Sequence, residues 1–175
     1  MTQVPRPAAI RTLEEGHRAT AELVAPLSDE ELARTATIGG GDWSAKDLIA
    51  HLADWERHAV EALAEWREGK RPWVEDVFTP EDTDRVNDEA VERSRGISPD
   101  EARARFERAY GDLVAAIDSL SDEEWNAKAP YETERRTRLG NLLGSITAAP
   151  KRPFGHAFAH LDDLRAYVDS LRTNA

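Results

Sequence analysis

The sequence predicts an all-α protein, and the most economical arrangement is a four-helix bundle with short accessory helices. Apolar residues recur at helical spacing in long segments, namely residues 8–26, 44–69, 98–120 and 154–171. Serines followed three positions later by an acidic residue mark helix starts, at Ser28, Ser44, Ser98 and Ser121. The sequence lacks the period-two alternation that would indicate strands.

The first half of the chain is expected to hold two long helices. The first runs from about residue 8 to 26, after a lead-in whose prolines disfavour helix. Ser28 opens a short helix through about residue 33, and the glycine-containing segment 34–42 is expected to be a loop. Ser44 caps the second long helix, because Asp47 lies three residues on, near the positive helix end.

The second half is expected to continue with helices between proline-containing loops. The clearest start signal is Ser98-Pro-Asp-Glu101, in which Ser98 caps the helix, proline occupies the first turn and Glu101 closes a capping box. The expected elements are a loop over 70–80, helices over 81–95 and 98–120, a single turn over 121–125, a loop over 126–137 and helices over 138–147 and 154–171.

Composition narrows the possible functions. The chain of 175 residues is expected to be a single domain, 1–175, because nothing in it resembles a linker. Its net charge of −11 argues against nucleic acid as a partner, since phosphates would be repelled. The chain has no cysteine, which excludes disulfides, thiolate metal sites and a cysteine nucleophile. No apolar run is long enough to span a membrane and no signal peptide is recognisable, so we expect a cytoplasmic location.

The histidines are the main candidates for a functional site. His156 and His160 lie four residues apart in a predicted helix, a spacing that lets both side chains reach one metal ion. A third ligand must come from elsewhere, and His51 shares the apolar stripe of another predicted helix with Leu48 and Leu52. An alternative is that these imidazoles are core residues that satisfy their hydrogen bonds within the protein.

Other residues are expected to surround this site as a substrate pocket. His58 lies two helical turns after His51, and His17 faces inward on the first helix. Trp55, Phe154 and Phe158 are aromatic neighbours of the candidate ligands and would line an apolar pocket. Trp43 and Trp66 are expected to be structural, and Glu56, which lies off the apolar stripe, is expected at the surface.

Two motifs resemble a known family. Trp43-Ser-Ala-Lys-Asp-Leu-Ile-Ala-His-Leu-Ala-Asp-Trp-Glu56 resembles a motif of the DinB/YfiT-like metalloenzyme superfamily. Gly155-His-Ala-Phe-Ala-His-Leu-Asp-Asp-Leu-Arg165 resembles the second motif, near the C-terminus. Within the superfamily, the similarity is greatest to the four-helix-bundle proteins of the ClbS/DfsB type, and it extends over the whole chain.

The resemblance implies a fold, a metal and a chemistry. It implies an up-down-down-up four-helix bundle in which His51, His156 and His160 hold a divalent transition metal such as zinc or nickel. It implies a low-molecular-weight thiol such as mycothiol as a cosubstrate in many members, and in the ClbS-like branch the opening of a strained ring by water. It also implies that DNA is not the usual partner. One departure is the segment Ala148–Pro153, which is expected to reshape the pocket mouth or displace His156.

Three classes of function follow from these observations. The first is a metal-dependent hydrolase or thiol transferase acting on a reactive electrophilic metabolite, for which an ion with open positions would acidify a bound water. The second is a metal-free protein that sequesters a drug or metabolite in an apolar pocket. The third is a bundle with structural histidines and an oligomeric or regulatory role. A small molecule is the expected partner, and a monomer or a homodimer is the expected assembly.

Overall fold

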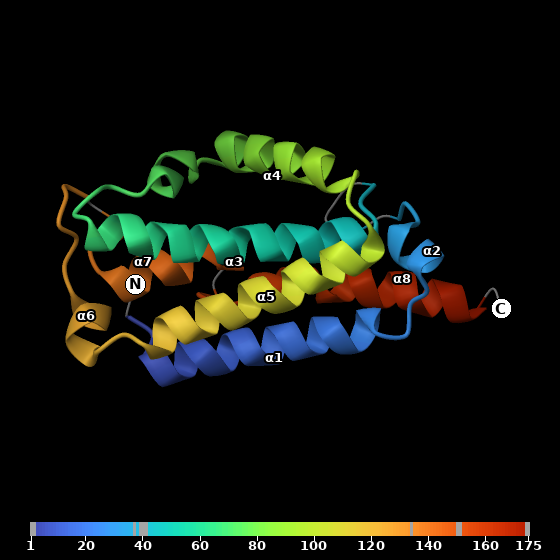
Figure 1. Cartoon of the computed structure of the whole chain (residues 1–175), viewed down its shortest axis with the longest axis horizontal. Coiled ribbons are helices and arrows are strands. Elements are labelled where there is room, and N and C mark those ends of the chain that lie inside the picture. Colours follow the sequence, from blue (N-terminus) through green and yellow to red (C-terminus); the bar gives the residue numbers. More distant parts are fainter. Residues whose placement is uncertain (1–2, 37, 39–41, 134, 150–151, 174–175) are drawn as a thin grey trace.

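The protein is all-α, as the sequence predicts. The computed structural model describes residues 3–36, 38, 42–133, 135–149 and 152–173, and these ranges hold helices, isolated bridges and no strand. The elements are α1 (Arg6–Val24), α2 (Asp29–Ala33), α3 (Ala45–Arg67), the 3₁₀ helix η1 (Trp73–Val77), α4 (Pro80–Ser94), α5 (Pro99–Asp118), α6 (Asp122–Asn126), α7 (Leu139–Ile146), the 3₁₀ helix η2 (His156–Ala159) and α8 (Leu161–Thr173) (Figure 1).

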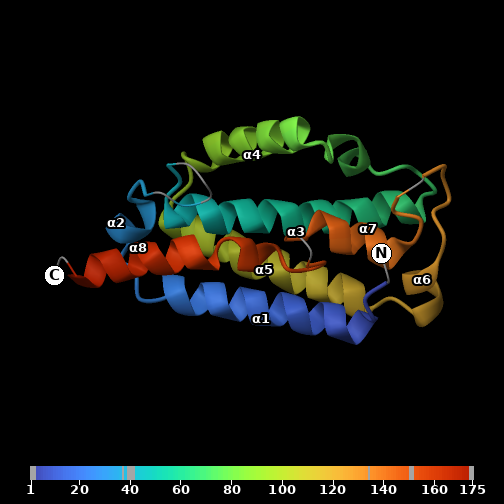
Figure 2. The ribbon, with the colours of Figure 1, turned by 180° about the vertical axis from the view of Figure 1, so that it is seen from behind.

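The long helices form an up-down-down-up bundle. In Figure 1, α1 and α8 run in one direction, whereas α3 and α5 run in the opposite direction. The parallel pair α3 and α5 is joined by η1 and α4, which return along the outside of α3. Seen from behind, α7 and α8 together occupy the fourth position of the bundle, one toward each end (Figure 2). The predicted fold class is therefore confirmed.

The central helix α3 is covered on almost every side. It packs against α5 and α7, while α4 covers its outer face. As a result, buried side chains surround the N-terminal part of α3, residues 45–53, whereas the buried residues of its C-terminal part follow one stripe. The polar residues Lys46 and Asp47 of the N-terminal part are accordingly buried.

Serine caps begin the helices where the sequence places them. Ser28, Ser44 and Ser121 form capping boxes in which both the serine and the following acidic side chain accept backbone hydrogen bonds. Ser98 accepts a bond from the Glu101 amide as expected, but the Glu101 carboxylate binds Arg105 instead of closing a box. Each cap satisfies amide groups that a helix leaves unpaired at its start.

The largest departure from the sequence prediction lies before the last helix. The expected helix over 154–171 is wrong at its start, because Phe154 has a φ of 61° and interrupts any helical path. The backbone here is held by bonds to α7, from the Phe154 amide to the Gly144 carbonyl and from the His156 amide to the Thr147 carbonyl. The chain then makes the short η2 turn before α8 begins at Leu161.

Smaller differences concern helix ends and one loop. Helix α1 starts at Arg6, because a proline at position 7 is compatible with the first helical turn. The expected loop over 70–80 contains η1. Part of the expected loop over 34–42 lies outside the described residues.

In the part of the chain that the structure describes, no helix has both the length and the apolar character needed to cross a membrane. The prediction of one domain over 1–175 stays a prediction.

The close contact between α7 and Phe154 predicts opposite effects for the same substitution at two helical glycines. A Cβ at Gly144 would lie 2.7 Å from the Phe154 ring, whereas a Cβ at Gly111 on α5 would meet nothing within 4 Å. We expect Gly144→Ala to lower the free energy of unfolding by about 1–2 kcal/mol through overpacking. Gly111→Ala should raise it by about 0.5–1 kcal/mol through helix propensity.

Urea denaturation of both variants against wild type measures these changes. A stabilised Gly144→Ala protein would contradict the tight packing of Phe154 against α7.

Candidate metal centre

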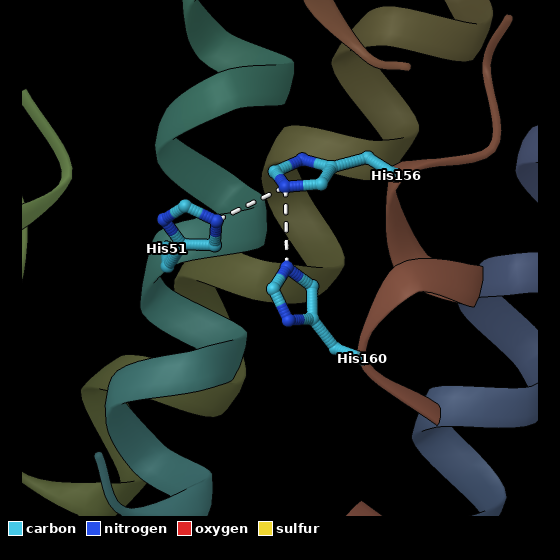
Figure 3. Close-up of side chains that lie close together, drawn as sticks. All are labelled: His51, His156 and His160. Atoms are coloured by element: carbon cyan, nitrogen blue, oxygen red, sulfur yellow. Dashed lines mark hydrogen bonds between the residues drawn. The ribbon is translucent and has the colours of Figure 1, made fainter. Parts of the chain in front are cut away.

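Three histidines from distant parts of the chain converge on one point. His51 projects from the N-terminal third of α3, and His156 and His160 project from the η2 turn (Figure 3). The Nε2 atom of His156 lies 3.0 Å from that of His51 and 3.3 Å from that of His160. One nitrogen of each ring lies within 4.8 Å of the others, and this is the group of three residues that the sequence predicted.

The local backbone explains how His156 and His160 reach His51. Their spacing of four residues was expected on an α-helix, but η2 is a 3₁₀ turn and His160 is the residue that caps it. The absence of a side chain at Gly16 lets η2 lie close to α1, because a Cβ there would be 3.0 Å from Ala157 and 3.2 Å from Phe158. The break in the helix at Phe154 therefore brings His156 to the site and does not displace it.

The electrostatic setting keeps all three imidazoles neutral. Burial lowers the pKa of His51 well below its ordinary value, and positive charge on His156 or His160 would lower it further. Burial, with a contribution from His160, lowers the pKa of His156 to about 3. Burial also lowers the pKa of His160, against the opposing charge of Asp163. The ring nitrogens therefore keep lone pairs available for a ligand at neutral pH.

The donor set fits a divalent transition metal. Two nitrogens bound to one ion at about 2.1 Å and at angles of about 90–105° lie about 3.0–3.3 Å apart. The two short separations at His156 have these values. A neutral His156 offers one lone pair or one N–H at Nε2, so it cannot form a good hydrogen bond with both neighbours at once. A cation shared by the three nitrogens would satisfy all of them.

Neighbouring aromatic rings enclose the triad. The Trp43 ring lies 4.8 Å from that of His51 and 6.3 Å from that of His160. Trp55 lies 6.2 Å from His156 and donates its indole N–H to Asn87 on α4. The sequence predicted a structural role for Trp43, but the structure places it beside the triad. Its position immediately before the Ser44 cap indicates that it lies near the start of the helix that carries His51.

The predicted pocket residues separate into two groups. Trp55, Phe154 and His17 lie around the triad, since Phe154 and His17 line an interior cavity together with His156. His58 and Phe158 do not join them. His58 contacts Glu61 further along α3 and Trp73 of η1. The Phe158 ring lies beneath the Arg152 guanidinium, 3.6 Å from its central carbon.

The expectation of a surface position for Glu56 holds only in part, because the residue is partly exposed but one of its carboxyl oxygens is buried. Its side chain lines the same cavity as His17 and His156, and its Oε2 atom is buried without a hydrogen-bond partner among the described residues. The reason is the central position of α3, whose off-stripe side faces α1 and α5. Asp54, two residues earlier on α3, pairs with Arg57 and is likewise partly exposed.

Comparisons with known proteins agree with the fold. A family model described as the mycothiol maleylpyruvate isomerase N-terminal domain matches residues 13–165. No curated protein sequence matches significantly. An uncharacterised protein from Escherichia coli UTI89 has a similar structure, with a TM-score of 0.75 and 13% identity over 97% of this chain and 96% of that one.

Two further solved structures are similar to this chain. A mycothiol-dependent maleylpyruvate isomerase superposes with a TM-score of 0.67 and 18% identity over 94% of this chain, which spans 63% of the isomerase. The colibactin self-resistance protein ClbS, crystallised with double-stranded DNA, has a TM-score of 0.72 and 16% identity over 97% of this chain and 98% of ClbS.

At these identities the neighbours establish the fold alone, whereas the family model covers most of the chain. The DinB/YfiT-like, ClbS-type resemblance inferred from the motifs around His51 and His156 is confirmed. The chain belongs to the family of the mycothiol maleylpyruvate isomerase N-terminal domain, within the DinB-like superfamily.

Proposed function

We propose that this protein is a metal-dependent thiol transferase or hydrolase that modifies a reactive electrophilic small molecule. The observation that carries the proposal is the convergence of three neutral imidazoles, with nitrogens 3.0 and 3.3 Å apart at His156. Family membership and the two named neighbours support a role in modifying small molecules or in resistance to them.

The proposed ligands are His51, His156 and His160. A divalent ion such as zinc or nickel held by three histidines supplies a Lewis acid with open positions for a small molecule. His51 is buried, but His156 and His160 are partly exposed, so a substrate would approach from the η2 side. Trp43 and Trp55 would present apolar surface to it.

Of the two proposed reactions, thiol transfer has the stronger support. The matching family model takes its name from a mycothiol-dependent isomerase, and a structural neighbour carries the same name. A low-molecular-weight thiol such as mycothiol is therefore the cosubstrate to test first. This chain spans only 63% of that isomerase, so we do not assign the reaction and substrate of the isomerase to this protein.

Sequestration of a ligand in an apolar bundle pocket is the less favoured candidate. The interior cavity beside His156 measures about 10 Å³. Pockets that hold drug-sized molecules enclose about 300–1,000 Å³. This cavity would need to open considerably before it could enclose such a ligand.

The proposed metal centre predicts that metal content depends on the triad and not on histidine in general. Untagged wild-type protein should contain about one equivalent of transition metal by elemental analysis. His51→Ala and His160→Ala should lose it, because two remaining imidazoles bind an ion weakly. His58→Ala is the matched control, since His58 lies on the same helix but outside the triad, and it should keep the metal.

A wild-type protein that stays metal-free after incubation with zinc, nickel and manganese would overturn the metal-dependent function.

The proposed cosubstrate predicts that thiol binding requires the metal. Isothermal titration of mycothiol should show binding to the metal-loaded protein and at least about tenfold weaker binding to the metal-free protein, because thiolates are preferred ligands of zinc. S-methylated mycothiol is the control, as it keeps the sugar but cannot form a thiolate. Equal binding of both compounds would argue against thiol transfer and in favour of hydrolysis.

The acidic character of the chain predicts that it does not share the DNA binding seen in the ClbS crystal structure. With a net charge of −11, the protein should repel the phosphate backbone. Fluorescence anisotropy with a labelled duplex at low salt should therefore show no binding at micromolar protein. Binding that weakens steeply as salt is added would show that DNA is a partner.

A further inference from the structure

Glu56 carries a carboxyl group that the metal centre does not use, and one of its two oxygens is buried although the residue is partly exposed. It lies on α3 immediately after Trp55, and its Oε2 atom finds no hydrogen-bond partner among the described residues. Burying such a group without a partner is costly. This unpartnered oxygen belongs to a residue that lines the same cavity as His156. The position is consistent with a role in carrying a proton for the reaction at the triad.

His17 reaches the same cavity from α1. Its ring stacks against Phe106 and Tyr110 of α5, with centroids 4.3 and 3.9 Å away. Its Nε2 atom lies 3.2 Å from Oε2 of Glu107, whose side chain is 65% exposed. Its Nδ1 atom is buried and unpartnered among the described residues. One nitrogen of His17 therefore faces an exposed carboxylate, while the other is inside the protein.

The cavity between these groups has the size and polarity for one water molecule. Its volume of about 10 Å³ is close to the smallest space that holds a single water. The unpartnered Glu56 Oε2 and His17 Nδ1 belong to residues that line it, and Thr147 lines it as well. A water with two to four polar partners is the usual occupant of such a space.

We propose that Glu56 stores and exchanges the proton used in the reaction at the triad, and that one cavity water, His17 and Glu107 connect it with solvent. The assignment of a proton to that reaction rests on the proposed function, whereas the connection itself does not. Glu56 and His17 line one cavity beside His156, and His17 contacts the exposed side chain of Glu107.

The transfer balances without any further reactant. Neutral His17 carries its proton on Nε2, where it donates to Glu107, and its Nδ1 lone pair accepts. Glu56 gives its proton to the water, the water gives one to His17 Nδ1, and His17 releases its Nε2 proton to the Glu107 carboxylate, from which solvent takes it. The net change is one proton moved from Glu56 to solvent, and the reverse order restores it.

Protonation states near neutral pH agree with these roles. Burial, with a contribution from the charge of Glu107, raises the pKa of Glu56 to about 8. Burial lowers the pKa of His17, against the opposing effect of Glu107, so this ring stays neutral. The titratable groups around Glu56 from the packed elements are His17 of α1, Glu107 and Tyr110 of α5, and His156 of η2.

Carbon-detected NMR of ¹³C-labelled glutamate in metal-free protein tests the proposal. The Glu56 carboxyl should titrate near pH 8, with one averaged resonance at the midpoint. His17→Phe keeps an aromatic stack but removes both nitrogens, so proton exchange should slow about tenfold or more and the resonance should split. His17→Gln gives a second variant should the phenylalanine variant misfold. Glu107→Gln should lower the Glu56 midpoint, because it removes a negative charge.

A Glu56 carboxyl that titrates near 4.5 in wild type, or exchange that is equally fast in both His17 variants, would overturn the proposal. A merely structural His17 would not change the exchange rate. Because the protein is metal-free throughout, a failure of metal binding leaves this result intact, and a failure here leaves the metal centre intact.

A stability measurement gives an independent check on the buried carboxyl. The folded-state pKa of Glu56 lies above its unfolded value, so the folded protein holds this proton more tightly. Its contribution to stability is therefore lost as pH rises from about 4.5 to 8. Glu56→Gln has no proton to lose, and its urea midpoint relative to wild type should rise across this range. Parallel pH profiles for the two proteins would contradict the burial of an ionisable group.

Discussion

A layer of polar side chains crosses the bundle and divides its hydrophobic core. One apolar cluster includes Leu13, Trp55 and Leu113, and the other includes Val24, Leu52 and Phe106. The layer contains His17, His51, Glu56 and His156: His17 lies between Leu13 and Val24 on α1, and His51 and Glu56 flank Leu52 and Trp55 on α3. Buried polar groups are costly unless they are paired. The helices must therefore pack so that the side chains of this layer lie next to one another.

The layer can exist because α3 is enclosed. A helix at the rim of a bundle buries one stripe and exposes the remainder, whereas the N-terminal part of α3 buries residues around its circumference. His51 and Glu56 can therefore project from one helix toward different neighbours, His51 toward η2 and Glu56 toward α1 and α5. The same helix thus supplies a proposed metal ligand and a proposed proton-carrying group on separate sides.

Sequence patterns were most informative where a local signal decides the structure. The serine caps and the apolar periodicity are local, and they placed most helix boundaries within a few residues. The histidine triad emerged because spacing and family resemblance converge on His51, His156 and His160. The buried oxygen of Glu56 was missed because a prediction from an apolar stripe assumes that the remainder of the helix faces solvent. The break at Phe154 depends on hydrogen bonds to Gly144 and Thr147, which no local pattern records.

The two halves of the metal centre are separated by 105 residues, the interval between His51 and His156. During synthesis, α1, α3 and α5 can associate before the last segment is made, since chains fold from the N-terminus as they emerge. The centre closes only when η2 docks onto α1. Completion of the binding site therefore coincides with completion of the fold, so a metal ion held by all three histidines would be acquired at the final step of folding.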